Sequence, residues 1–144
     1  MPTSWFLVPI LVGLFQPLLW QMNLRLARSS GDMEAAVLLH AVGTVVGLAW
    51  VLGGLRGQGF GQVGTVPWWA WLGGAVGVTC MAAMNRAIPV VGVAAALALT
   101  VGAQLLAALL FEHFGLLGAT VRIISPERLL GAAMLALGAW LISR

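Results

Sequence analysis

Long apolar stretches alternate with short polar segments along the whole chain. A helix needs about 20 predominantly apolar residues to cross a hydrocarbon core about 30 Å thick. Five stretches approach that length, at residues 4–23, 34–55, 67–85, 89–111 and 128–143. We therefore predict an all-α polytopic membrane protein in which residues 1–144 form a single transmembrane domain of five helices.

Prolines and polar residues mark the predicted helix ends. Pro67 and Pro89 suit a first helical turn, where a missing N–H costs least. Ser125 precedes Pro126 and Glu127, an arrangement typical of a helix N-terminus. The predicted connections are residues 25–32, the glycine-rich residues 56–64, the short link 86–89 and residues 112–127.

The composition excludes a soluble domain. It is 61% hydrophobic and 8% charged, whereas soluble domains carry roughly 25% charged residues. In a bilayer, lipid solvates the outward apolar side chains and intrahelical hydrogen bonds satisfy the backbone.

The first stretch has no basic residues before it and is interrupted by Gln16, Pro17 and Gln21, so we interpret it as a retained helix and not as a signal peptide.

The few reactive and charged residues argue against several function classes. Cys80 is the single cysteine, so we expect neither a disulfide framework nor a metal cluster. The seven arginines are spread over the connections and form no basic stripe, which argues against nucleic-acid binding. Scattered Ser, His and Asp residues cannot assemble a nucleophile, a base and an orienting group, so we expect no enzyme and no cofactor.

Arginine placement is almost balanced across the membrane. With five crossings, three arginines fall on the side of the N-terminus and four on the other: Arg56, Arg122 and Arg128 against Arg25, Arg28, Arg86 and Arg144. An excess of Lys and Arg on one side sets the orientation of a membrane protein. Two interpretations stay open: a few arginines fix one orientation, or the chain inserts both ways and pairs antiparallel with itself or with an oppositely oriented paralogue.

Polar side chains within the spans are the first candidates for function, because they are costly in lipid unless they find partners or line a wet cavity. The candidate substrate-binding residues are Gln16, Gln21, Asn23, His40, Asn85, Thr100 and Gln104, together with Trp68 from an aromatic cluster suited to an interfacial belt or to acyl chains. The alternative is that the amides join helices by hydrogen bonds worth about 0.6 kcal/mol on average.

Three further residues give specific expectations. Histidine is the side chain that most readily carries protons in proteins, so His40 is either a proton carrier or a neutral packed side chain. His113 follows Glu112, which favours an interfacial ion pair between them. Pro17 frees the carbonyl of Gly13, and the predicted kink suits a helix that walls a polar cavity.

Small residues recur at helical spacing and predict close helix contacts. On the fourth predicted helix they are Gly92, Ala96, Thr100, Ala103 and Ala107. On the fifth, Gly131 and Gly138 lie seven residues apart and predict a second contact seam.

Several strings resemble the drug/metabolite transporter superfamily, and within it the short five-helix YdcZ-type branch. They follow the same order along nearly the whole chain: Gln21-Met22-Asn23, Pro67-Trp68-Trp69-Ala70-Trp71-Leu72-Gly73-Gly74, Gln104-Leu105-Leu106-Ala107-Ala108-Leu109-Leu110 running into His113-Phe114-Gly115, Arg128-Leu129-Leu130-Gly131 and Leu137-Gly138-Ala139.

The resemblance implies half of an inverted-repeat transporter fold, in which two oppositely oriented five-helix units form a ten-helix transporter. It implies an exporter of small molecules in the bacterial inner membrane, with a second copy or a paralogue as partner and a central polar cavity. Four-helix relatives of the small multidrug resistance type carry an embedded glutamate in the first helix, where this chain has Gln16, so their proton antiport is not expected. A flippase for a lipid-linked substrate and a non-transporting interaction subunit remain the alternatives.

Overall fold

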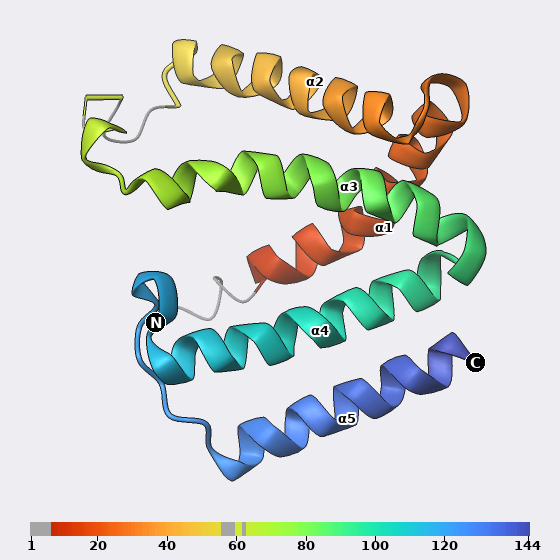
Figure 1. Ribbon diagram of the computed structural model, residues 1–144, viewed down its shortest axis with the longest axis vertical. Helices are drawn as coiled ribbons and strands as arrows, with labels where there is room; N and C mark the ends of the chain where they lie inside the picture. Colours follow the sequence, from red (N-terminus) through yellow and green to blue (C-terminus); the bar gives the residue numbers. More distant parts are fainter. Residues whose placement is uncertain (1–6, 56–59, 62) are drawn as a thin grey trace. The chain divides into compact units, whose positions relative to one another are not determined.

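The computed structural model describes residues 7–55, 60–61 and 63–144. Its five α-helices are α1 (Leu7–Ser30), α2 (Asp32–Leu52), α3 (Leu72–Val91), α4 (Val93–Phe114) and α5 (Pro126–Ser143) (Figure 1). Short 3-10 turns form η2 (Val63–Thr65), η3 (Trp68–Trp71) and η4 (Leu116–Gly118). No strand occurs in these ranges, which confirms the all-α prediction.

Four helical segments are long and apolar enough to cross a membrane. Within the part of the chain that the structure describes, they are Leu7–Ser30, Asp32–Leu52, Trp68–Val91 and Val93–Phe114. The fifth predicted span corresponds to α5, which has 18 residues and is not one of the four. The predicted helix start at residues 4–6 and the connection around Arg56 lie outside the described residues.

Single glycines separate two pairs of consecutive helices. Gly31 lies between α1 and α2 with φ 106°, and Gly92 lies between α3 and α4 with φ 83°. At each glycine the N–H donates to the carbonyl four residues earlier, and the carbonyl accepts from the N–H four residues later, over 2.8–3.0 Å. Both glycines therefore keep their own N–H and C=O groups hydrogen-bonded to the helices on either side.

The predicted connections at residues 25–32 and 86–89 are therefore wrong. Arg25 and Arg28 lie within α1, and Pro89 lies inside α3 near its end and does not begin the next helix. Charged side chains favour a connection in the sequence pattern, yet an exposed arginine is compatible with a helix that continues beyond the apolar core. The positive φ at a glycine, which costs other residues free energy, sets the actual boundary.

Two compact units make up the chain, Met1–Arg86 and Ala87–Arg144. In the first unit α1 packs against α2. The buried residues of α1 follow one helical stripe and comprise Trp20, Asn23, Leu24 and Ala27. Ala35 and Ala36 are fully buried at the start of α2, where small side chains let the two helices approach closely.

In the second unit α4 and α5 lie side by side (Figure 1). A Cβ atom placed on the buried Gly102 would lie 3.9 Å from Cβ of Ala139, so the two backbones approach at these positions. Ala132 and Ala139 are the buried residues of α5. The predicted seam at Gly131 and Gly138 is thus one residue out of register.

The α4 face predicted from small residues is also only partly buried. Ala96 is buried, but Ala103 and Ala107 are exposed, and the other buried residues are Ala95, Gly102 and Leu109. Because α4 contains seven alanines and small residues occur on more than one side of it, their spacing did not identify the face that packs inside the unit.

The connection between α4 and α5 is held by polar contacts. Arg128 forms an ion pair with Glu112, so the predicted pairing of Glu112 with His113 is wrong. His113 Nδ1 instead accepts a hydrogen bond from the Ile124 N–H over 3.4 Å. Ser125 caps α5 by accepting from the Arg128 N–H, which confirms the predicted N-terminus.

Replacing Gly31 with alanine should destabilise the fold by about 1–3 kcal/mol, because its φ of 106° and ψ of 159° are nearly exclusive to glycine. The matched control is Gly43→Ala within α2, where an added Cβ would meet nothing within 4 Å and should be neutral or slightly stabilising. Tryptophan fluorescence during thermal unfolding in detergent measures both. Equal unfolding temperatures for the two variants would contradict the assigned role of Gly31.

Candidate functional site

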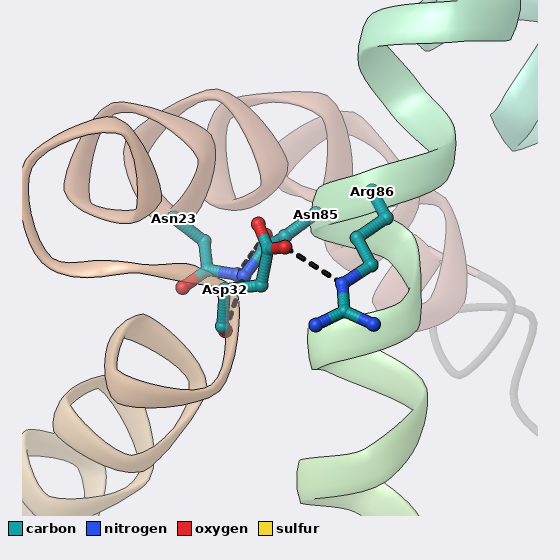
Figure 2. Close-up of polar contacts among 4 residues, drawn as sticks. All are labelled: Asn23, Asp32, Asn85 and Arg86. Carbon is teal, nitrogen blue, oxygen red and sulfur yellow. Dashed lines mark hydrogen bonds and ion pairs between the residues drawn. The ribbon is translucent and has the colours of Figure 1, made fainter.

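A buried amide pair joins α1 to α3 inside the first unit (Figure 2). Nδ2 of Asn23 donates to Oδ1 of Asn85 over 2.6 Å. The residues are 1% and 3% exposed, and they are the buried polar residues of the described chain. Of the residues proposed from sequence to bind substrate, these two are directly hydrogen-bonded to each other.

A backbone carbonyl fixes the direction of the hydrogen bonds in this pair. Nδ2 of Asn85 donates to the carbonyl oxygen of Asp32 over 2.9 Å. Because a carbonyl can only accept, the Asn85 nitrogen must face Asp32 and its oxygen must face Asn23. The Asn23 nitrogen then has to be the donor, so both amide orientations follow from one acceptor.

The same direction leaves one atom without a partner. Oδ1 of Asn23 is buried and has no hydrogen-bond partner among the described residues. Figure 2 shows this oxygen on the side of the amide that faces away from Asn85. A buried acceptor left unpaired costs about 1–3 kcal/mol, so the arrangement carries an unused capacity for a hydrogen-bond donor.

Gly31 and the start of α2 position the carbonyl that anchors the pair. Because the turn consists of this single residue, Asp32 begins α2 directly after the end of α1. The Asp32 carboxylate also pairs with Nε of Arg86 over 2.8 Å. The side chain of Arg86 is 78% exposed, so the ion pair adds little stability by itself. The ion pair does occupy the Asp32 carboxylate, which is therefore already compensated by a positive charge.

Asp32 and Arg86 were not proposed as site residues from the sequence. Both fall in predicted connections, where an Asp and an Arg are typical solvated surface charges. The one sequence signal for them was adjacency. Asn85 directly precedes Arg86, and Asp32 directly follows the turn glycine, so each is a neighbour of a residue that positions the amide pair.

His40 faces α3 with a defined tautomer. Its Nδ1 contacts the Ala36 carbonyl oxygen at 2.7 Å, and since that oxygen can only accept, Nδ1 carries the hydrogen. In the neutral ring Nε2 is then an acceptor. It would lie 3.4 Å from a Cβ atom placed on Gly77 of α3, so a glycine keeps this nitrogen free of a neighbouring side chain there.

Gln16 lies in a groove of about 430 Å³ between α1 and α2. The other residues that line the groove are apolar: Val12, Phe15, Leu18, Leu19, Met22 and Leu39. Gln21 is exposed and Trp68 is 74% exposed, and neither belongs to the buried amide pair. Pro17 lies inside α1 next to Gln16, as expected.

The last two candidates belong to the second unit. Thr100 is half-buried and Gln104 is exposed on α4. Each unit therefore carries part of the predicted polar set. No group of three or more His, Cys, Asp or Glu residues able to hold a metal ion occurs in the described ranges.

Comparison with known proteins identifies relatives of this chain. The family described as "Putative inner membrane exporter, YdcZ" matches residues 4–141. The chain is 32% identical over 127 residues to "Inner membrane protein YdcZ" of Escherichia coli (strain K12), covering 85% of this chain and 83% of that protein. No solved structure was found to match.

The amide pair should behave as one coupled unit in a double-mutant cycle. Asn23→Leu and Asn85→Leu each leave a buried partner unpaired and should cost about 1–3 kcal/mol. The double variant removes both, so it should be destabilised less than the sum by about 0.5–2 kcal/mol. Unfolding in detergent measures the three variants, with the exposed Thr44→Val as control. Strict additivity would show that the 2.6 Å contact does not couple the two residues.

Proposed function

The chain belongs to the YdcZ family of inner membrane proteins, and from this premise we propose that it exports a small polar or amphipathic solute across the bacterial inner membrane. The functional unit is an antiparallel dimer of five-helix units, each with α5 as its fifth span. Solute passes through a central polar cavity shared by the two copies.

The observation that carries this proposal is a buried amide pair within otherwise apolar spans. Most large apolar side chains of the four candidate spans are exposed, which suits contact with lipid and with further helices. Polar groups at membrane depth are retained where they bind a solute or join helices. In Asn23 one acceptor is left over after the helix-joining bond has been made, which favours a binding role.

The proposed solute-contacting residues are Gln16, Gln21, Asn23, His40, Asn85, Thr100 and Gln104, with Trp68 at the rim. Asn23 and Asn85 stand first, because they are buried and their orientations are fixed. His40 has an unprotonated Nε2 in its neutral form, which supports a role as proton acceptor if protons drive export.

A second candidate function is a flippase for a lipid-linked substrate. The groove between α1 and α2 supports it, since an apolar lining with the single amide of Gln16 suits an acyl chain with one polar attachment. Trp68 and Trp71, 74% and 61% exposed, would meet lipid at the start of α3. A non-transporting interaction subunit has no comparable observation in its favour.

The antiparallel dimer can be tested through the arginine balance. Changing Arg25 and Arg28 to Gln leaves two arginines against three and should fix the N-terminal side in the cytoplasm. Adding two lysines after Arg144 to the unaltered chain gives six basic residues against three and should fix the opposite orientation. Each fixed variant alone should purify as a monomer, and differently tagged variants should co-purify when they are co-expressed. A stable dimer from one fixed variant alone would instead indicate parallel protomers.

Transport itself can be tested in proteoliposomes with a panel of polar solutes. For a solute that the wild type carries, Gln16→Ala and Gln104→Leu should each lower the flux about fivefold, the effect of losing roughly 1 kcal/mol of polar contact. Thr44→Val, which alters an exposed hydroxyl bonded to its own helix, should leave the flux unchanged. Unchanged flux in both glutamine variants would remove these two residues from the path.

A further inference from the structure

The unpartnered oxygen of Asn23 restricts the chemistry of what binds there. Oδ1 accepts hydrogen bonds and cannot donate them, and its orientation is fixed through Asn85 by the Asp32 carbonyl. A ligand group that only accepts, such as a carboxylate or a phosphate, would place oxygen against oxygen. The complementary group is an N–H or an O–H.

The charges around the amide pair indicate that this donor is uncharged. The carboxylate of Asp32, whose backbone carbonyl anchors the pair, is already paired with Arg86. The other charged side chains of the α1–α2 hairpin are exposed: Arg25, Arg28 and Glu34. A cation placed at Oδ1 would therefore lack a counterion, and burying an uncompensated charge is strongly unfavourable.

We infer that Asn23 Oδ1 is the acceptor for a neutral hydroxyl or amide group of the exported solute, with Asn85 as the positioning residue that aims it. This inference rests on the proposed transport function. In the structure the oxygen is shielded from solvent, so a solute reaches it only after the ends of α1, α2 and α3 separate. An ordered water could supply the same donor, and the experiment below separates the two.

Three solutes with the same carbon chain length differ in the group at one end. Sorbitol has a neutral hydroxyl there, glucamine has a cationic ammonium and gluconate has an anionic carboxylate. The flux of each radiolabelled solute into proteoliposomes is measured. With the wild type, sorbitol flux should be the fastest, and the fluxes of glucamine and gluconate should be at least tenfold slower. This comparison uses the wild type alone, so it does not depend on whether a variant folds.

Asn23→Asp then tests direct contact, because it keeps the shape of the side chain and places a negative charge at the acceptor. It also removes the N–H that Asn23 donates to Asn85, so the ratio of the fluxes is the readout and not the rate alone. Sorbitol flux should fall at least tenfold, and the ratio of glucamine to sorbitol flux should rise at least tenfold. A purely structural change would lower all three fluxes together and leave the ratio unchanged. Thr44→Val is the control and should preserve both the rates and their order.

The alternative outcomes are distinct. Sorbitol flux that is insensitive to Asn23→Asp would mean that the oxygen holds an ordered water only, and the inference would be overturned. Faster wild-type flux of gluconate or glucamine than of sorbitol would also overturn it, while leaving export itself standing. If the wild type carries none of the three solutes, the inference is overturned. The proposed transport function is then judged separately, by whether the wild type carries any other solute of the wider panel.

Discussion

Satisfaction of the backbone hydrogen bonds is the constraint on which this structure depends. A chain with so few charged residues lies almost wholly in lipid, where an unpaired N–H or C=O has no water to bond with. Within a long helix the backbone groups bond to each other, but at each change of direction the groups at the helix ends again need partners. Gly31 and Gly92 limit the change of direction to one residue each, because at positive φ the N–H and C=O groups of each glycine still form hydrogen bonds with the helices on both sides of the turn.

The tight turn at Gly31 also fixes the geometry of the buried amide pair. With no loop between α1 and α2, the first carbonyl of α2 is brought close to the buried stripe of α1, and α3 places Asn85 between them. The resulting chain of hydrogen bonds has a fixed direction that ends on Asn23 Oδ1. A turn that exists for backbone reasons therefore determines which atom of the amide pair is left unpaired.

Two opposing requirements act on the polar residues of such a transporter. Amides that only join helices would be best with every donor and acceptor paired, since half-paired networks cost stability. A binding site needs the reverse, a group whose partner arrives with the solute. In the proposed role Asn23 would meet both requirements through different atoms, since Nδ2 is bonded to Asn85 and Oδ1 is unpaired. His40 resembles it, since Nδ1 is committed to its own helix and Nε2 is not.

The sequence alone determined the class of the protein and the approximate positions of its helices, because the length of an apolar run in lipid is a direct physical requirement. It also placed the cap at Ser125 and included Asn23 and Asn85 among the residues to examine. It misplaced the ends of α1 and α3, because Arg25 and Arg28 are compatible with a continuing helix and Pro89 lies within the end of α3, whereas the boundaries depend on φ at Gly31 and Gly92. Which amides meet, which of their atoms pair and which stay unpaired depended on residues 62 positions apart in the chain. Only the tertiary structure decides such contacts, since hydrogen-bond direction is a property of assembled groups and leaves no periodic pattern along the chain.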